Sequence, residues 1–255
     1  MRERLVILAA GGGSRLRQAR LASTKPMTEV GGVPLIVRVL MGARRIGVRR
    51  ADIVIGYKGD ENKEALLGKW RIEGVSLRFI ENPAWSNTAN GVSLLAAADD
   101  KTPFYLSMAD HLFDDAIWDV AQTAPTPEGG VSLLIDRKIS QCFDIDDATK
   151  VKTNGLGQAG AQHIVAISKE LPEYDALDCG LFTVTDGIFE TLTEELALRG
   201  DCSLSDGMRR LGAKGKFWGV EVGGAFWHDV DTPEAFAFAE SYLAKQKTQP
   251  SASAR

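Results

Sequence analysis

The chain has 255 residues, of which 44% are hydrophobic and 25% are charged, and this composition excludes a protein that is mainly disordered. The length suits one large domain, or one domain with a small subdomain. The 30 basic and 34 acidic residues give a net charge of -4, which argues against nucleic acid as a partner.

The cysteines and the apolar runs indicate a cytoplasmic protein. Cys142, Cys179 and Cys202 have neither the number nor the spacing of a disulfide framework or a zinc site. No run approaches the roughly 20 apolar residues of a membrane span, and glycines interrupt the first apolar run too early for a signal peptide. We therefore expect no membrane partner, whereas the oligomeric state stays open.

The first half of the chain alternates between predicted strands and helices. Residues 5–9 form a continuous apolar run, typical of a strand that is buried on both faces of a parallel sheet. Pro34 and Gly47 favour the start and the end of a helix over 34–46. The following elements are strand 52–57, helix 61–69, strand 76–81, helix 92–98, strand 104–108 and helix 115–121. This alternation predicts an α/β fold with a doubly wound, mostly parallel, Rossmann-like sheet and right-handed crossovers.

The pattern changes after Gly129. Four strand-like stretches with little helix between them predict a small mixed or antiparallel β region, and they are 131–136, 149–153, 163–168 and 179–184. The remaining elements are helices 187–198 and 204–211, strand 216–222 and a last helix from 233 to about 245. No repeat or low-complexity linker divides the chain. We therefore expect a single domain over 1–245 and a flexible tail over 246–255.

The loop after the first strand carries the strongest chemical signal, with the sequence Leu8-Ala-Ala-Gly-Gly-Gly-Ser-Arg-Leu16. Three consecutive glycines let backbone N–H groups approach phosphate oxygens, and Arg15 adds a forked donor. The glycines alone fit a tight strand-to-helix turn equally well. The loop lacks the Gly-Lys-Ser/Thr end of a P-loop, and Leu16 stands where a dinucleotide-binding loop has its third glycine.

Lys25 and Asp110 are the next candidates. Pro26 disfavours helix at Lys25, which argues against the helix that a dehydrogenase needs directly after its glycine loop. Lys25 can bind a second phosphate, although a solvated surface charge is the alternative. Asp110 follows strand 104–108 at the edge where open α/β sheets bind ligands, and a carboxylate there suits Mg²⁺. Helix capping is the other explanation of Asp110, but Asp114 competes for that role.

The segment from Trp227 to Glu234 contains the last candidate. Either Asp231 or Thr232 can cap the helix that begins near Pro233. Asp229 has no such explanation, so we expect it to face Asp110 as a second metal carboxylate.

Two other polar features predict no site. The segment Asp144-Ile-Asp146-Asp147 is excluded as a calcium loop, because Thr149 and Gly155 occupy the positions of the required glycine and glutamate. The three histidines form no metal-binding motif, and single histidines usually make structural hydrogen bonds.

The four candidate segments together resemble the GT-A-like nucleotidyltransferases, which join a nucleoside triphosphate to a sugar or polyol phosphate. The likeness covers residue 4 to about residue 240, and it is greatest to inositol-1-phosphate and phosphocholine cytidylyltransferases. The segments that carry this closer likeness are Asn82-Pro83, Asn90-Gly-Val-Ser-Leu94, Met108-Ala-Asp-His111, Ala148-Thr-Lys-Val151, Asp178-Cys-Gly-Leu-Phe182 and Asp229-Val-Asp-Thr-Pro-Glu234.

The resemblance implies a set of site residues. It implies that the nucleotide is bound by Ala10, Gly11, Gly12, Gly13, Arg15, Lys25, Asn90, Gly91 and Asp110. The catalytic residues would be Arg15, Lys25 and Asp110, and the Mg²⁺ ligands would be Asp110 and Asp229. For the acceptor it implies Lys150 or Lys152 at the phosphate and a pocket lined by Asp178 and Gly180. Cys179 departs from the pattern, since a threonine or another small residue is expected there.

The implied reaction transfers a cytidylyl group from CTP to a phosphorylated polyol or alcohol, with inositol 1-phosphate favoured, and releases pyrophosphate. The alternatives are a sugar-1-phosphate uridylyl- or thymidylyltransferase, a phosphocholine cytidylyltransferase, an NAD(P)-dependent oxidoreductase and a non-catalytic nucleotide sensor. An acceptor phosphate is ionised near neutral pH. We therefore expect positioning and charge neutralisation, rather than a general base, to supply the catalysis.

Overall fold

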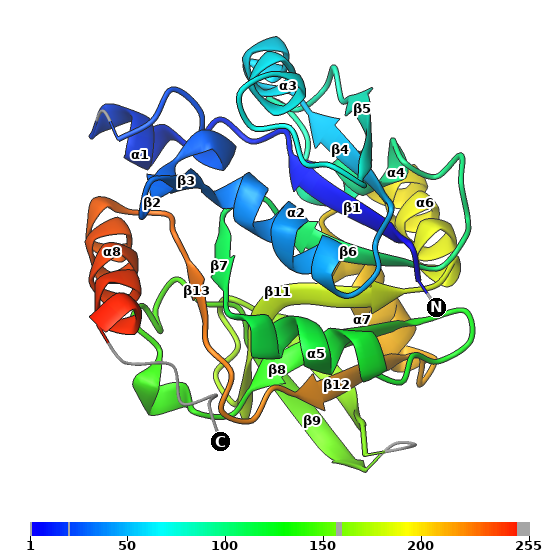
Figure 1. Ribbon diagram of the computed structural model, residues 1–255. Coiled ribbons are helices and arrows are strands. Elements are labelled where there is room, and N and C mark those ends of the chain that lie inside the picture. The colour runs from blue at the N-terminus through cyan, green and yellow to red at the C-terminus, as the bar shows by residue number, and fades with distance from the viewer. Residues whose placement is uncertain (1, 20, 157–159, 249–255) are drawn as a thin grey trace.

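The computed structural model describes residues 2–19, 21–156 and 160–248, and a nine-stranded sheet forms its centre (Figure 1). The strand order is β5-β4-β1-β6-β11-β8-β12-β10-β9. The strands of this sheet are β1 Arg4–Ala9, β4 Arg50–Ile55, β5 Ser76–Glu81, β6 Phe104–Met108, β8 Val131–Asp136, β9 Lys150–Leu156, β10 Gln162–Ser168, β11 Ala176–Val184 and β12 Phe217–Glu221. Two small sheets pair β2 Glu29–Val30 with β3 Val33–Pro34, and β7 His111–Phe113 with β13 Trp227–Asp229.

The large sheet has a parallel part and a mixed part. Strands β5, β4, β1 and β6 are parallel neighbours. Beyond them β11 is antiparallel to both β6 and β8, β12 is parallel to β8, and β10 is antiparallel to β12 and β9. The predicted α/β class, with a mixed region joined to a parallel sheet, is confirmed. The mixed region is larger than expected, because it contributes five strands to the central sheet.

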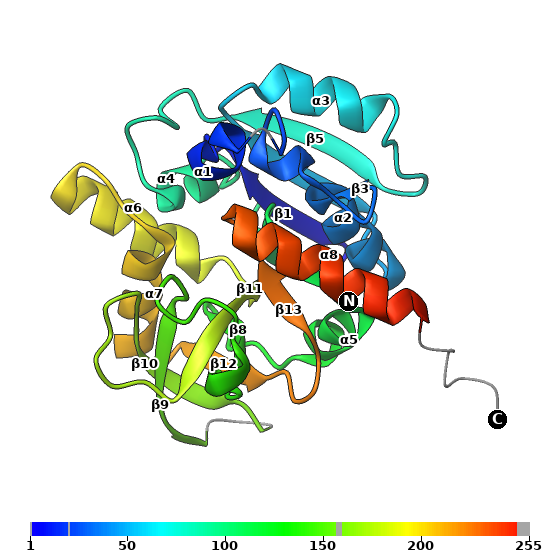
Figure 2. The ribbon, with the colours of Figure 1, turned by 90° about the vertical axis from the view of Figure 1, so that its left-hand side faces the viewer.

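Helices cover both faces of this sheet (Figures 1 and 2). The helices are α1 Ser14–Gln18, α2 Leu35–Arg45, α3 Gly59–Leu67, α4 Asn90–Leu95, α5 Asp115–Thr123, α6 Gly187–Arg199, α7 Leu204–Ala213 and α8 Pro233–Thr248. Helices α2, α3 and α5 pack into one apolar cluster, and α4, α6 and α7 pack into the cluster on the opposite face. In the described part of the chain no helix is both long and apolar enough to cross a membrane.

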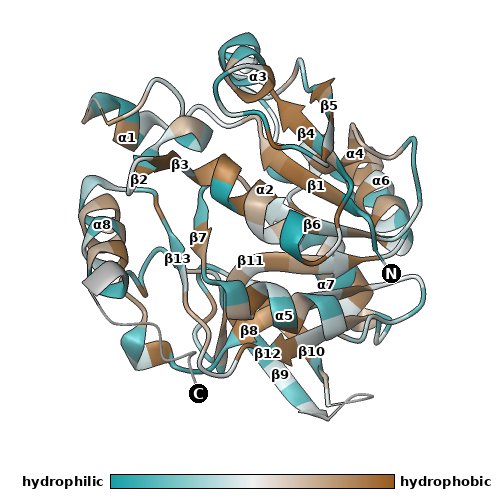
Figure 3. Ribbon diagram, viewed as in Figure 1, coloured by the Kyte–Doolittle hydropathy of each residue, from teal (hydrophilic) through white to brown (hydrophobic). Residues whose placement is uncertain are grey.

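The apolar run of residues 5–9 in β1 follows from the central place of this strand. Leu5 and Ile7 point into the cluster of α2 and α5, whereas Val6 and Leu8 point into the cluster of α4 and α6. Successive side chains of a strand face opposite sides, so a strand covered on both faces has no polar face. Figure 3 shows the same contrast, with hydrophobic central strands and outer helices of mixed hydropathy.

Three elements differ from the sequence prediction near the site. Helix α1 begins directly after the glycine loop, because Gly13 adopts a left-handed conformation with φ 56° and allows the chain to turn. The helix ends at Gln18, and Pro26 lies in a separate 3₁₀ turn over Lys25–Met27. Helix α4 begins at Asn90, two residues earlier than predicted.

At the carboxyl end α8 continues to Thr248, so the first three residues of the predicted tail are helical. The rest of that tail lies outside the described residues, and the single domain over 1–245 stays a prediction.

Candidate active site

The candidate site lies at the carboxyl ends of β1 and β6. These strands are parallel neighbours with Leu8 opposite Met108, and the Ala109 N–H donates to the Leu8 carbonyl oxygen at 3.2 Å. The glycine loop therefore leaves the sheet beside the segment that carries Asp110. Ligands of open α/β sheets bind at this edge.

The glycine loop has two structural functions. A Cβ on Gly13 would lie 2.5 Å from the Lys25 Cβ, so only glycine lets Lys25 pass this close to the loop. Gly11 faces open space, which leaves its backbone accessible to a ligand. Arg17 braces the loop, since its guanidinium donates to the Gly12 carbonyl oxygen and to the Tyr57 hydroxyl, both at 2.7 Å.

Asp110 is held between a histidine and a lysine. The His111 Nδ1 donates to Asp110 Oδ1 at 2.7 Å, and Asp110 Oδ2 contacts the Lys25 ammonium. Burial would raise the pKa of Asp110, but the Lys25 charge and the His111 hydrogen bond outweigh burial and hold this pKa well below its usual range. Asp110 is therefore ionised at neutral pH. Asp114 accepts a hydrogen bond from the Ile117 N–H at 3.1 Å and caps α5, so Asp110 has no capping role.

The pairing of β7 with β13 brings Asp229 to Asp110. Asp229 lies opposite His111 in this ladder, and its Oδ1 is 4.0 Å from the Lys25 Nζ. Asp110, His111 and Asp229 each offer a ligand atom, and these atoms lie within 4.8 Å of one another. Burial and the neighbouring Asp110 charge raise the pKa of Asp229. Its Oδ1 is buried without a hydrogen-bond partner among the described residues, which fits a site that receives a cation.

Asp231 is a site residue that the sequence analysis did not assign to the site. Thr232 caps α8, because its Oγ1 accepts the Ala235 N–H at 3.1 Å, so Asp231 is free of the capping role considered for it. The Asp231 carboxylate instead contacts Lys25 and lies 3.1 Å from Arg15 Nη2. A signal was present in the sequence: Asp229 and Asp231 flank the fully buried Val230, as alternation in an extended segment requires.

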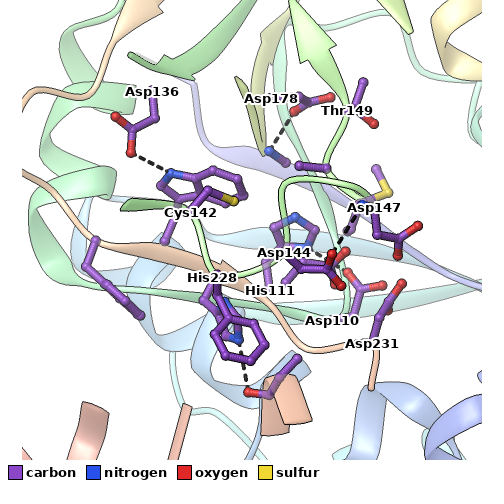
Figure 4. A pocket seen from close by; sticks show the side chains of 18 of the residues that line it. Asp110, His111, Asp136, Cys142, Asp144, Asp147, Thr149, Asp178, His228 and Asp231 are labelled. Carbon is purple, nitrogen blue, oxygen red and sulfur yellow. Dashed lines mark hydrogen bonds and ion pairs between the residues drawn. The ribbon is translucent and has the colours of Figure 1, made fainter. Parts of the chain in front are cut away.

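Two pockets meet at Asp110. The loop pocket, of about 350 Å³, is lined by the glycine loop together with Arg15, Lys25 and Asn90. The wide pocket, of about 610 Å³, is lined by polar residues of β8 and β11 and by the segment around Asp144 (Figure 4). The residues that border both pockets are Asn90, Met108, Asp110 and Asp231. The arrangement can therefore hold two ligands that touch at Asp110.

Asp178 and Gly180, the residues expected to line the acceptor pocket, lie on the lining of the wide pocket. The Gly180 N–H donates to Asp178 Oδ1 at 2.7 Å, and burial raises the pKa of Asp178 to about 6. Gly180 has φ 75°, and a Cβ there would overlap the His111 ring. Cys179 points into the apolar core, so its departure from the expected small residue does not change the pocket lining.

Lys150 and Lys152, the lysines expected at the acceptor phosphate, already have partners in the structure. The Lys150 ammonium donates to the Asp146 carbonyl oxygen at 3.0 Å, and the Lys152 Nζ lies 3.9 Å from Asp175 Oδ2. Neither lysine borders the pockets that the described residues outline. The lysines that line the wide pocket are Lys138 and Lys169.

Asp147 connects the two pockets across the cleft. Its Oδ2 lies 3.1 Å from Arg15 Nη2, and its Oδ1 lies 2.6 Å from Lys169 Nζ. This residue belongs to the acidic segment that predicted no site. Its partners lie far away in the sequence, so no local pattern could have identified it.

Asn90 and Gly91 have different environments. Asn90 borders both pockets, and its Oδ1 accepts the Leu204 N–H at 2.9 Å. A Cβ on Gly91 would lie 2.6 Å from the Cys202 carbonyl oxygen, so this glycine allows α4 to pack closely against the chain before α7.

The fold and the site together are those of a nucleotidyltransferase: the chain belongs to the family of the MobA-like NTP transferase domain, whose model matches residues 5–141. Among curated relatives it is 32% identical to the "Bifunctional IPC transferase and DIPP synthase" of Aquifex aeolicus, over 96% of this chain and 53% of that protein. A protein of the same name from Rubrobacter xylanophilus is 30% identical over 93% of this chain and 51% of that protein. The chain thus spans about half the length of these relatives.

Solved structures share the fold. The inositol-1-phosphate CTP transferase from T. maritima superimposes with a TM-score of 0.80 and 24% identity over 97% of both chains. A UDP-glucose pyrophosphorylase complexed with UDP-glucose superimposes with a TM-score of 0.76 and 18% identity, over 96% of this chain and 100% of the other. The family membership leaves the NAD(P)-dependent oxidoreductase alternative without support.

Proposed function

We propose that the protein is a Mg²⁺-dependent cytidylyltransferase of the cytoplasm that transfers the cytidylyl group of CTP to a phosphorylated polyol, with inositol 1-phosphate as the favoured acceptor. The observation that carries the proposal is the position of Asp110, which lies beside Asp229 and Lys25 where the loop pocket meets the wide pocket. The names of the relatives support the choice of nucleotide and acceptor. The three free cysteines support a reducing compartment.

The reaction needs one bond to form and one to break. An oxygen of the acceptor phosphate attacks the α-phosphorus of CTP, and the bond from that phosphorus to the oxygen bridging to the β-phosphorus breaks. Pyrophosphate leaves with the electron pair. Because the attacking oxygen is already ionised near neutral pH, no side chain has to remove a proton, and alignment of the two substrates is the main requirement.

The loop pocket provides the groups that bind a nucleoside triphosphate. Backbone N–H groups of Gly11 and Gly13 are open to phosphate oxygens, and Arg15 and Lys25 add two positive charges. Both charges would stabilise the departing pyrophosphate. Asn90 and the backbone around Ala10 would meet the nucleoside. Cytosine and uracil differ there, since their exocyclic groups are a donor and an acceptor respectively.

The acidic pair fits a divalent cation. Two carboxylates, with His111 beside them, offer hard oxygen ligands on the side of the cleft where the α-phosphate would lie. Asp110 and Asp229 would hold this cation, which would supply positive charge to neutralise the reacting phosphates. His111 fixes the Asp110 orientation through its 2.7 Å hydrogen bond to Oδ1, so that Oδ2, which contacts Lys25, is the oxygen that would meet a cation.

The wide pocket suits an acceptor with several hydroxyl groups. Asp178 can accept hydroxyl hydrogen bonds, and Lys138 or Lys169 would meet the acceptor phosphate in place of Lys150 and Lys152. Asp136 adds a second carboxylate, which already accepts from Trp227 Nε1 at 3.0 Å.

A pyrophosphate-release assay tests the proposal. Each of CTP, UTP, ATP, GTP and dTTP is combined with inositol 1-phosphate, glucose 1-phosphate or phosphocholine in the presence of Mg²⁺. We expect CTP with inositol 1-phosphate to react fastest and CTP to exceed UTP at least tenfold, since a mismatched polar group costs roughly 1 to 3 kcal/mol. Faster turnover of UTP or dTTP with glucose 1-phosphate would replace the cytidylyltransferase assignment by a sugar nucleotidyltransferase. Nucleotide binding without any pyrophosphate release would indicate a sensor.

A further inference from the structure

Lys25 occupies the place among the carboxylates that a divalent cation needs. Its ammonium contacts Asp110 and Asp231 and lies 4.0 Å from Asp229 Oδ1. Asp110 and Asp229 are the two carboxylates proposed above to hold the metal. An ammonium and a divalent cation repel each other and compete for the same oxygen atoms, so they cannot both bind Asp110 Oδ2.

We propose that Lys25 is an internal counter-ion of the metal site: it neutralises Asp110 until the metal arrives, and it then moves entirely to Asp231. This inference rests on the proposed metal site. It deepens that proposal by giving Lys25 a function before any nucleotide binds, and by assigning Asp231 as the positioning residue that receives the displaced ammonium.

The geometry allows the exchange to be a movement of one side chain. The Lys25 backbone is fixed, because it packs against Gly13, where an added Cβ would lie 3.4 Å from the Lys25 Cα. Its neighbour Thr24 is buried and donates to Asn62 Oδ1 at 2.6 Å, and Pro26 is buried as well. Only the flexible end of Lys25 is free to turn from Asp110 to Asp231.

Asp231 is suited to receive the ammonium because it stands outside the group that can hold the metal. That group consists of Asp110, His111 and Asp229 in the part of the chain that the structure describes. Asp231 already contacts Lys25 and also lies 3.1 Å from Arg15 Nη2. It therefore keeps both phosphate-binding cations at the loop pocket after Asp110 and Asp229 have turned to the metal.

The charges explain why the exchange favours the metal. Three carboxylates, Asp110, Asp229 and Asp231, face two cations, Lys25 and Arg15. One negative charge remains in excess, and the Oδ1 atom of Asp229 is buried with no hydrogen-bond partner in the described residues. A divalent cation satisfies this excess, whereas Lys25 lowers the affinity for it by competing at Asp110.

Binding of Mn²⁺ to the nucleotide-free protein tests the proposal by calorimetry. We expect Lys25→Met to bind Mn²⁺ at least tenfold more tightly than wild type, because the competing charge is gone. Lys169→Met is the matched control: it makes the same substitution on another cleft lysine, which pairs with Asp147, and its affinity for Mn²⁺ should stay within twofold of wild type. Equal affinities of wild type and Lys25→Met would overturn the exchange and leave the metal site standing.

A second measurement does not depend on the folding of a variant. Crystals of the wild-type protein soaked in Mn²⁺ without nucleotide should show the anomalous peak between Asp110 and Asp229, with the Lys25 ammonium bound to Asp231 alone. A peak at this position with Lys25 still on Asp110 would overturn the inference. If neither wild type nor Lys25→Met bound Mn²⁺, even with CTP present, the proposed metal site itself would fail.

Discussion

Asp110 is ionised, and its side chain is partly buried. Asparagine has nearly the same shape as aspartate but no charge, so Asp110→Asn removes the charge alone. We expect Asp110→Asn to lower kcat/KM in the pyrophosphate-release assay by a factor that corresponds to at least about 3 kcal/mol of transition-state stabilisation. Asp115→Asn is the control, because it makes the same substitution at an exposed carboxylate in the first turn of α5. Near-normal turnover of Asp110→Asn would contradict the metal role.

Asp178 gives the stability a defined pH dependence. Its pKa is about 6 in the folded protein and near 3.8 in the unfolded chain, so the folded state holds more protons between these pH values. Stability from this group therefore falls as the pH rises from about 4 to 6, by about 2 to 3 kcal/mol, and stays lowered above that range. In urea unfolding with a chelator present, Asp178→Asn should be more stable than wild type at pH 8, with the difference vanishing near pH 4. A difference that is constant with pH would contradict this account.

Alanine variants of Gly180 and Gly200 distinguish the cost of steric overlap from the cost of backbone strain. Their φ angles are 75° and 74°, but a Cβ on Gly180 would overlap His111, whereas a Cβ on Gly200 would meet no atom within 4 Å. Gly200→Ala should cost only about 1 kcal/mol of stability. Gly180→Ala should cost clearly more and also weaken Mn²⁺ binding, since His111 must move away from Asp110. Equal costs by thermal unfolding would show that His111 has room to adjust.

At the scale of elements, the short helix α1 carries two arginines with different partners. Arg15 faces the loop pocket, while Arg17 braces the Gly12 carbonyl and the Tyr57 hydroxyl. We expect Arg15→Ala to lower kcat more than it weakens CTP binding, because its charge meets the leaving pyrophosphate mainly in the transition state. Arg17→Ala should chiefly raise KM by loosening the loop. Steady-state kinetics of both variants distinguish these roles. A rise in KM with unchanged kcat for Arg15→Ala would show that Arg15 contributes to ground-state binding of the nucleotide instead.

The elements that the sequence predicted well are those with strong periodicity. The strand and helix alternation of the parallel half and the four strands after Gly129 follow directly from apolar patterns. Helix α1 was missed because a left-handed glycine, instead of a capping side chain, begins it. Strands β7 and β13 have three residues each and pair across the chain, so no local window reveals them.

The site residues likewise divide into those that local sequence patterns reveal and those that depend on contacts between distant segments. Asp110 could be found from its position after a predicted strand, and Asp229 because helix capping did not explain it; the structure brings the two together. Asp147, Lys138 and Lys169 could not, since their place at the cleft depends on how the segment after β8 folds back over the wide pocket. The pair of Asp147 with Arg15 joins residues 132 positions apart, and such a pair leaves no trace in the spacing of the sequence.

At the scale of the whole molecule, the central sheet joins strands from both halves of the chain. Strand β11 lies between β6 and β8, and so connects the parallel and mixed parts. We expect one cooperative unfolding transition, in agreement with a single domain over 1–245. Far-UV circular dichroism and tryptophan fluorescence should give the same midpoint, since Trp118 and Trp218 are buried in different parts of the molecule. Two separated midpoints would indicate two domains.

The order in which the site residues occur along the chain matters during synthesis on the ribosome. Arg15 and Lys25 emerge early, but Asp229 and Asp231, which hold them in the folded protein, are translated near residue 230. A growing polypeptide therefore carries Arg15 and Lys25 long before it has their counter-charges. A chain that ends before Asp229 also lacks the strand that pairs with β7 and the whole of α8, so the part of the cleft that these elements form is completed only at the end of synthesis.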